Sequence, residues 1–406
     1  MSKLQELIKQ YCPNGVEYKK LGEVCDVLNG YAFKSNKYVN EGYRVIRIGD
    51  VQSGCFDNSD IRYYPKEEIE VYEKYKLNEY DIVVSLTGNC GRVAMVRKTI
   101  MPCALNQRVA ALRSKGIINQ SFLFYLINSK QFESRAMENA FGAGQKNLST
   151  RWLSNLEIPV PPLEVQEEIV KILDRFSEYA AELQAELQAR REQYEYYRDK
   201  LLSFNKIGGV LWLTMNEIFE IKNGYTPSKS VKEYWENGTI PWFRMEDIRK
   251  SGRVLSDAIQ HITPQAVKGG KLFSANSFIL ATTATIGEHA LLLVNSLANQ
   301  QFSNLKVREQ LSERLNTKYL YYYFFIIDEW CKNNTNVSGF ASVDMAKLKK
   351  LLIPIPPLSE QERIVGILDK FETLVNDLSE GLPSEIAAVG EQYEYYRNKL
   401  LTFPRA

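Results

Sequence analysis

The stretch EQYEYYRDKLLSF (residues 192–204) returns as EQYEYYRNKLLTF at residues 391–403, with eleven of thirteen positions identical. A second pair of similar stretches precedes it, IPVPPLEVQEEIVKILDRF (158–176) and IPIPPLSEQERIVGILDKF (353–371). Weaker similarities lie upstream in the same order: LGEVCDVLNGY (21–31) with MNEIFEIKNGY (215–225), RIGDV (47–51) with RMEDI (244–248), and LNQR (105–108) with ANQQ (298–301). The chain is therefore a tandem repeat.

The repeat divides the chain into four parts. We call residues 1–158 and 207–353 the blocks, and residues 159–206 and 354–406 the segments. The blocks have diverged strongly from each other, whereas the segments are closely similar. Net charge follows the same division, with +5 and +4 on the blocks and −3 and −4 on the segments. Two block domains and two helical segments are predicted, in the order block, segment, block, segment.

Composition indicates a globular protein. The chain has 406 residues, of which 45% are hydrophobic and 25% charged, and this length predicts two or three domains. Its first residues, MSKLQELIKQ, contain no apolar stretch, and the most apolar runs, 277–287 and 319–327, are too short to span a bilayer. We expect a soluble, cytoplasmic protein. The six cysteines form no CxxC pair, so neither a metal site nor a disulfide framework is predicted.

Each segment is predicted to form a long helix. Apolar residues in the first recur at alternating spacings of four and three, a heptad pattern with one polar member: Ile169, Leu173, Phe176, Ala180, Leu183, Leu187, Arg190, Tyr194, Tyr197 and Leu201. Each helix begins after a Pro-Pro pair, where proline suits the first turn. A helix from Leu163 to Phe204 would be roughly 60 Å long, at about 1.5 Å per residue.

The second segment departs from this pattern at one point. Its heptad pattern runs from Ile364 through Leu378 to Leu382 and resumes at Ile386, an insertion that would locally unwind a supercoil. Gly381 and Pro383 lie at the insertion, so a kink or break is expected there. Two helices with matching apolar faces can pair within one chain. Antiparallel pairing would relate the two blocks by a pseudo-twofold axis.

The blocks are predicted to be mixed α and β. Four β-rich runs predict short strands at residues 43–48, 81–86, 92–96 and 277–282. Helices are predicted at 119–140 and at 316–332. The fold class is therefore α+β, with two mixed domains joined by two long antiparallel helices in a pseudo-twofold internal repeat.

Catalytic motifs are scarce. The chain has two histidines, His261 and His289, both in the second block. No GxGxxG or GxxxxGK[ST] motif is present. There is also no NPPY motif of the kind found in enzymes that methylate the amino groups of bases. We therefore predict neither catalytic nor metal-binding residues.

DNA binding fits the blocks better. Lys and Arg position a protein on phosphates, while Arg, Asn and Gln read base edges. The candidate DNA-binding residues lie in turn-like stretches: Lys34, Asn36, Arg47, Asn89, Arg92, Gln107, Arg108 and Lys146 in the first block, and Lys229, Lys232, Arg244, Arg249, Arg253, Thr283, Gln300 and Gln301 in the second. The modest net charge of each block predicts a partner that adds DNA contacts of its own.

The repeated segments predict a protein interface. Tyr194, Tyr197, Tyr393 and Tyr396 are expected to pack between the helices. The candidate partner-binding residues are expected on the outer face, where they would present the same surface twice: Glu192, Glu195, Arg198, Glu391, Glu394 and Arg397. Two similar surfaces favour two copies of one partner.

The chain resembles the specificity subunit of type I restriction-modification systems. The motifs that carry this resemblance are CPNGVEYKKLGEV (12–24), the two PPLxxQ helix starts and the two EQYEYYR stretches, and it covers essentially the whole chain. It implies a non-catalytic subunit whose two target-recognition domains each read one half of a bipartite, asymmetric site in double-stranded DNA. Two modification subunits, which bind S-adenosylmethionine and methylate adenine, and two restriction subunits, which use ATP and Mg, would dock on it. AELQAELQ (181–188) resembles the four-residue repeats whose copy number sets the spacer length in this family.

Two alternatives stay open from the sequence. The chain could be a DNA methyltransferase or nuclease that acts alone, or a coiled-coil adaptor that binds only proteins. The bases that are read cannot be predicted, because direct readout depends on loop geometry and DNA shape.

Overall fold

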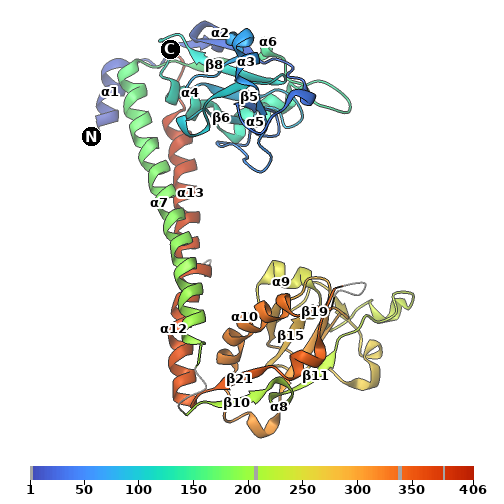
Figure 1. Cartoon of the computed structure of the whole chain (residues 1–406). Helices are drawn as coiled ribbons and strands as arrows, with labels where there is room; N and C mark the ends of the chain where they lie inside the picture. Colours follow the sequence, from blue (N-terminus) through green and yellow to red (C-terminus); the bar gives the residue numbers. More distant parts are fainter. Residues whose placement is uncertain (1–2, 205–208, 337–340, 378–379) are drawn as a thin grey trace. The chain divides into compact units, whose positions relative to one another are not determined.

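A computed structural model describes residues 3–204, 209–336, 341–377 and 380–406 (Figure 1). The chain divides into two compact units. Unit 1 comprises Met1–Gln184 and Ile386–Ala406, and unit 2 comprises Ala185–Glu385. Unit 1 thus contains the whole first block, and unit 2 contains the whole second block. Each unit also contains parts of both helical segments.

Unit 1 contains three small sheets. The first has the order β2-β8-β5-β6 and is antiparallel throughout: β2 Cys25–Asn29, β8 Val109–Ser114, β5 Ile82–Ser85 and β6 Val93–Met95. The second has the order β4-β3-β7, with β3 and β7 parallel: β4 Tyr63–Tyr64, β3 Tyr43–Ile46 and β7 Cys103–Leu105. The third joins β1 Tyr18–Lys20 to β9 Glu157–Pro159, near the two limits of the first block.

Helices of unit 1 surround these sheets. They are α1 Lys3–Tyr11, α2 Leu21–Val24, α3 Lys66–Ile69, α4 Gln120–Ile127, α5 Lys130–Glu138, α6 Thr150–Asn155, the first part of α7 Leu163–Leu201, and α13 Leu382–Leu400 from Ile386 onward. The predicted helix at 119–140 is two helices, because Ser129 caps a new helix by accepting a hydrogen bond from the Phe132 N–H at 3.2 Å.

Unit 2 repeats the plan of unit 1. Its main sheet has the order β11-β18-β15-β16-β13: β11 Phe219–Asn223, β18 Phe302–Val307, β15 Ser277–Ala281, β16 His289–Leu292 and β13 Val254–Leu255. Smaller sheets have the orders β14-β12-β17, β10-β21 and β19-β20: β14 His261–Ile262, β12 Ile240–Phe243, β17 Leu297–Ala298, β10 Leu211–Thr214, β21 Leu352–Ile355, β19 Thr335–Asn336 and β20 Ser342–Val343. Its helices are the end of α7, α8 Met215–Ile218, α9 Met245–Ser251, α10 Thr317–Asn333, α11 Met345–Lys349 and α12 Leu358–Asn376.

Within unit 1, α7 and α13 run antiparallel. Phe176 of α7 stacks on Tyr396 of α13, with ring centroids 5.6 Å apart. The start of α7, through Val165 and Ile169, shares a hydrophobic core with Phe403, which follows the end of α13. This core also takes in buried side chains of α4 and of one face of the four-stranded sheet, so the first block and both helices form one folded unit.

Within unit 2, α7 and α12 make the equivalent pairing. Tyr197 of α7 stacks on Phe371 of α12, with ring centroids 5.8 Å apart, and Tyr194 lies 6.4 Å from the same ring. Figure 1 shows that the end of α7 lies beside the start of α12. The same aromatic contact thus recurs in both units with the two segments exchanged. The predicted α+β fold with antiparallel helices and an internal repeat is confirmed.

The second segment is interrupted as expected. Helix α12 ends at Asn376 and α13 begins at Leu382, while Leu378, a predicted member of the heptad pattern, lies outside the described residues. Gly381 packs closely against the end of α12, since a Cβ there would lie 2.4 Å from the carbonyl oxygen of Thr373. Pro383 occupies the first turn of α13, which tolerates proline. Across the described residues, no helix is both long and apolar enough to cross a membrane.

Candidate nucleic-acid interface

A buried glutamine in each PPLxxQ motif joins a block to its own helix. In unit 1 the Gln166 amide accepts a hydrogen bond from the Asn119 N–H at 2.7 Å and donates to the Pro161 carbonyl at 2.7 Å. In unit 2 Gln361 accepts from the Asn316 N–H at 2.9 Å. Because Asn119 and Asn316 cap α4 and α10, each glutamine holds the start of a block helix that packs on its segment.

An aspartate in each repeated ILD motif makes a second anchor. The Tyr125 hydroxyl of α4 donates to Asp174 at 2.5 Å, and the Tyr322 hydroxyl of α10 donates to Asp369 at 2.7 Å. Burial, followed by the nearby carboxylates, raises the pKa of Tyr322 well above its ordinary value. The glutamine and aspartate contacts are therefore a physical reason for the two segments to be similar. The helical pattern alone did not reveal this reason.

Three turns of unit 1 lie side by side and form what we call loop row 1. It comprises the turn at 106–108, the turn at 87–91 and the hairpin at 141–147. The Leu86 N–H donates to the Arg108 carbonyl at 2.9 Å, and the Gly88 N–H donates to the Lys146 carbonyl at 2.9 Å. Loop row 1 brings together four exposed candidate DNA-binding residues: Asn89, Gln107, Arg108 and Lys146.

Unit 2 contains the corresponding arrangement, loop row 2. It comprises the turn at 299–301, the turn at 282–287 and strand β20. The Thr282 N–H donates to the Gln301 carbonyl at 2.9 Å, and the Val343 N–H donates to the Thr282 carbonyl at 2.9 Å. Thr283 also pairs with Ser342 through a β-bridge. Candidates Thr283, Gln300 and Gln301 therefore lie in one row.

A repeated NGY motif supports both loop rows. The Gln107 N–H donates to the Tyr31 carbonyl at 2.7 Å, and the Tyr225 N–H donates to the Ala298 carbonyl at 2.9 Å. A Cβ at Gly30 would lie 1.9 Å from the Asn106 carbonyl oxygen, and one at Gly224 would lie 2.1 Å from that of Asn299. Glycine is required at both positions because the two backbones are in contact.

A pocket of about 510 Å³ in unit 2 gathers four of the candidates. Lys229, Lys232, Arg244 and Gln300 line it together with Trp235, Trp242, Asn299 and Gln260. The indole rings of Trp235 and Trp242 meet edge to face with centroids 5.0 Å apart. The buried Nε of Arg244 has no hydrogen-bond partner among the described residues. The pocket thus combines cations, amides, aromatic faces and an unused donor.

Two candidate arginines of unit 1 pair with groups of their own chain, as Arg244 does with Glu246 at 2.9 Å. Arg47, the counterpart of Arg244, bonds Asp50 at 2.8 Å and Asp60 at 3.2 Å. These carboxylates raise the pKa of its guanidinium. Arg92 donates to the side chain of Gln52 at 2.6 Å and faces Glu133.

One candidate of unit 2 lies partly in the interior. The Arg253 guanidinium donates to Asp328 at 3.0 Å and contacts His289, whose Nδ1 lies 2.7 Å from the same carboxylate. Burial lowers the pKa of His289. Arg253 stays a candidate, although its side chain is 27% exposed and its charge balances that of a buried aspartate.

The remaining candidates lie apart from the loop rows. Lys34 and Asn36 are exposed around the 3-10 helix Ser35–Lys37, which α3 approaches through an ion pair of 2.7 Å between Lys37 and Glu68. Arg249 is exposed on α9.

The helix candidates for partner binding are only partly exposed. Glu192, Glu195 and Glu391 are exposed, and Glu394 is half-buried. Arg198 and Arg397 do not lie on an outer face: the Arg198 side chain is 12% exposed, and Arg397 donates to the Asn128 carbonyl at 2.9 Å. Their guanidinium groups instead pack over Tyr194 and Tyr393.

Two tyrosines that the helical pattern missed are exposed instead. Tyr196 is 60% and Tyr395 is 61% exposed. Each ring meets its neighbour edge to face, at 5.3 Å from Tyr197 and 5.2 Å from Tyr396. A lysine lies near each ring, Lys200 at 5.6 Å and Lys399 at 5.8 Å. The middle tyrosine of each EQYEYYR stretch could have been identified from its position opposite the heptad face.

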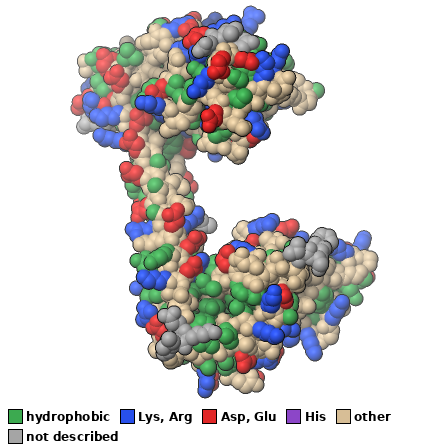
Figure 2. All heavy atoms as spheres, viewed as in Figure 1, with side chains coloured by type: hydrophobic (Ala, Val, Ile, Leu, Met, Phe, Trp, Pro, Cys, Tyr) green, Lys and Arg blue, Asp and Glu red, His purple; other side chains and the backbone are tan. Residues whose placement is uncertain are grey.

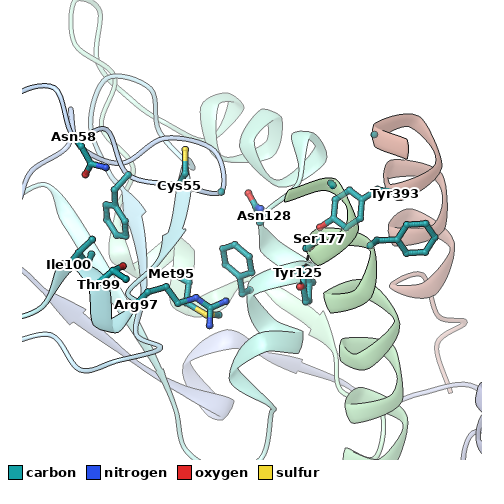
Figure 3. Close-up of a pocket in the computed structure, with 16 residues that line it drawn as sticks. Cys55, Asn58, Met95, Arg97, Thr99, Ile100, Tyr125, Asn128, Ser177 and Tyr393 are labelled. Atoms are coloured by element: carbon teal, nitrogen blue, oxygen red, sulfur yellow. Dashed lines mark hydrogen bonds between the residues drawn. The ribbon is translucent and has the colours of Figure 1, made fainter. Parts of the chain in front are cut away.

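A second cavity, of about 540 Å³, is lined by residues of both the first block and the two segments (Figure 3). Ser177 of α7 and Tyr393 of α13 line it, together with Met95, Arg97 and Tyr125 of the first block. None of the candidate DNA-binding residues lines it. It is therefore distinct from loop row 1. In the part of the chain that the structure describes, no cluster of three or more His, Cys, Asp or Glu side chains could hold a metal ion.

Comparison with known proteins identifies the family. The family model described as type I restriction modification DNA specificity domain matches residues 13–192 and 212–388, once in each repeat. The chain belongs to the type I restriction-modification specificity subunits. A Haemophilus influenzae protein that is named as a type I restriction enzyme specificity subunit is 30% identical to this chain, over 96% of each chain.

Higher identities cover parts of the chain. The specificity subunit of the type I restriction enzyme EcoprrI from Escherichia coli is 50% identical over 48% of this specificity subunit and 50% of its own length. The specificity subunit of the type I restriction enzyme EcoR124I/EcoR124II, also from Escherichia coli, is 41% identical over 63% of this specificity subunit and 66% of its own length. The matches thus span about half and about two thirds of these relatives.

Solved structures agree in fold. A chain from a study of complex assembly and conformational transition of the type I R-M system has a TM-score of 0.65 at 19% identity, covering 96% of this specificity subunit and 98% of that chain. The S subunit of a type I restriction-modification system from M. genitalium has a TM-score of 0.50 at 16% identity. The match covers 96% of this specificity subunit and 97% of that chain.

Proposed function

We propose that the chain recognises a bipartite, asymmetric site in double-stranded DNA, with one half read by each unit. The chain would itself carry no chemistry. Modification subunits would supply S-adenosylmethionine-dependent methylation of adenine, and restriction subunits would supply the nuclease with its ATP and Mg. Each block, 1–158 and 207–353, would form a target-recognition domain, and the segments 159–206 and 354–406 would form the spacer between them.

The pocket of unit 2 is the observation that carries this proposal. Arg244 and Gln300 offer the donors and acceptors that recognise base edges, and Lys229 and Lys232 offer charges for phosphates. The unpaired Nε of Arg244 favours a bound acceptor, since a buried donor without a partner costs about 1–3 kcal/mol. The other candidates, including Lys34, Asn36, Arg47, Arg92 and Arg249, would contribute phosphate contacts.

Surface charge supports a role for partners in DNA binding. On the face in view in Figure 2, basic and acidic side chains are interspersed on both units. Non-specific DNA affinity depends on the number of phosphates that a protein neutralises. A chain with a net charge of +2 would therefore bind DNA tightly only when its partners add contacts.

Docking of two modification subunits would use the repeated helix surface. Its centre would be Tyr196 in one copy and Tyr395 in the other, because an exposed aromatic ring supplies much of the energy of a typical interface. Glu192, Glu195, Glu391 and Glu394 would surround these rings. Arg198 and Arg397 would act indirectly, by holding Tyr194 and Tyr393 in place.

Binding measurements with single substitutions test the reading of DNA. Gln300→Ala should relax discrimination at one base pair of one half-site by about 1–3 kcal/mol, and Gln107→Ala should do so in the other half. Gln188→Ala, an exposed glutamine of α7, is the matched control. Fluorescence anisotropy of the chain assembled with a modification subunit provides the readout. Equal losses in both half-sites, or methyl transfer by the purified chain alone, would contradict the proposal.

A further inference from the structure

A hairpin of loop row 1 presents an unusually exposed aromatic side chain. Phe141 is 63% exposed, more than Tyr196 or Tyr395. It begins the hairpin at 141–147, in the same row as Asn89, Gln107 and Arg108. No large hydrophobic side chain among the described residues is more exposed, so the ring is accessible to a partner.

The hairpin is held firmly in position. The Phe141 N–H donates to the Asn147 carbonyl at 2.9 Å, and the Asn147 N–H donates back to the Phe141 carbonyl at 2.8 Å. The Asn147 side chain accepts from the Thr87 hydroxyl at 3.0 Å and donates to the Gln145 carbonyl at 2.9 Å. These bonds fix the base of the hairpin to the neighbouring turn, so little ordering is needed when it binds.

Glycine makes the tight turn possible. Gly142 has φ +116°, and a Cβ there would lie 2.3 Å from the Gln145 carbonyl oxygen. No heavy atom lies within 4 Å of the position that a Cβ would take at Gly144 or Gly88. The backbone around Phe141 is therefore narrow and open, a shape that can approach stacked bases closely.

The chemistry around Phe141 favours DNA as its occupant. Lys146 and Arg108 are exposed cations of the same row, and Asn89, Gln107 and Gln145 are exposed amides. A protein partner would be expected to cover an apolar patch, whereas here one ring stands among groups that bind phosphates and base edges. Phenylalanine rings that insert between base pairs unstack and kink a duplex.

We propose that Phe141 is a wedge that enters the DNA half-site bound by unit 1 and partly unstacks one base-pair step. The flexible pyrimidine–purine steps would accept it most readily, so the wedge would select sequence by deformability as well as by base contacts. This inference rests on the proposed function, because it assumes that loop row 1 faces DNA. Unit 1 would then recognise DNA partly by how easily a base-pair step deforms, whereas unit 2 would use the base contacts of its pocket.

Fluorescence of 2-aminopurine tests the wedge directly. Duplexes with the chain's recognition site would carry the probe at successive positions, leaving out the adenine that a modification subunit would itself extrude. With the full chain assembled with a modification subunit, fluorescence should rise at one step of one half-site. Phe141→Ala should abolish that rise and weaken binding about tenfold, whereas Phe141→Trp should keep both.

Controls separate the possible outcomes. Ile117→Ala, an exposed apolar residue beyond the other end of β8, should change neither signal. If the unaltered chain does not distinguish its site from a scrambled duplex, the proposed function fails and the wedge with it. If it does distinguish them but no step unstacks, only the wedge is overturned. If Phe141→Ala impairs assembly with the modification subunit instead of DNA binding, the occupant is protein and the inference is wrong.

Discussion

Replacement of Gln361 by leucine tests how each block is fixed to its helix. The Gln361 amide is buried and makes three hydrogen bonds: it accepts from the Asn316 N–H at 2.9 Å and donates to the carbonyls of Arg314 at 3.0 Å and Pro356 at 2.8 Å. Leucine has a similar volume and would leave no large cavity. The substitution therefore removes the bonds with little change in packing.

The expected cost follows from counting these bonds. At a net value of about 1 kcal/mol for each hydrogen bond, Gln361→Leu should lower the free energy of unfolding by about 3 kcal/mol. Gln166→Leu breaks the two bonds of the equivalent residue in unit 1, so its cost should be about 2 kcal/mol. The three backbone groups left without partners could raise the cost of Gln361→Leu further.

Urea unfolding followed by tryptophan fluorescence measures this difference. Trp212, Trp235, Trp242 and Trp330 belong to unit 2, whereas unit 1 contains Trp152, so the signal reports mainly on unit 2. Gln188→Leu, at an exposed position, is the matched control and should change the stability by less than about 0.5 kcal/mol. Gln361→Leu should also weaken discrimination in the half-site of unit 2 alone.

A cost for Gln361→Leu no greater than that of Gln188→Leu would refute this reasoning. It would mean that packing of α10 on α12, without the buried amide, is enough to place the block. Equal loss of discrimination in both half-sites would also count against it.

Three further predictions concern the surface, a thiol and pH. Tyr196→Ala and Tyr395→Ala should each reduce the number of bound modification subunits by one, as seen by native mass spectrometry; loss of both subunits from one substitution would contradict two separate docking surfaces. Cys55 is exposed, whereas burial raises the pKa of Cys103 to about 12, so iodoacetamide at pH 8 should label Cys55 first in peptide mass spectra. Burial lowers the pKa of His289 below its ordinary 6.5, so as the pH falls this histidine takes up a proton more readily in the unfolded chain than in the folded one. The free energy of unfolding of unit 2 should therefore decrease as the pH drops below about 6.5. A stability that does not change with pH in this range would contradict the prediction.

The helical part of the fold could be predicted from the sequence. The heptad pattern correctly identified the face of α7 that carries Leu173 and Tyr194, and the step in that pattern located the break before α13. The pattern could not show that Arg198 and Arg397 fold back on their own unit. Long side chains at the edge of an apolar face can pack their stems there, and the sequence does not say which do so.

The surroundings of the candidate DNA-binding residues were harder to predict from the sequence. Residues in turns that follow repeated motifs, such as Gln107 and Gln300, lie in the loop rows. The pairing of Arg253 with Asp328 was not predicted, because the two lie 75 residues apart and no local pattern shows that they meet. Phe141 was missed because a phenylalanine in the sequence gives no sign of being exposed. Tertiary contacts decide these cases.

Sequencing of adenine methylation across a genome tests the central claim most directly. Cells would carry the chain with its modification partner, either unaltered or with residues 181–184 of the AELQAELQ stretch deleted. Four residues shorten α7 by about 6 Å, which corresponds to nearly two base pairs. The account predicts a bipartite site whose two halves stay the same while the unread spacer becomes shorter. Altered half-sites with an unchanged spacer would contradict it.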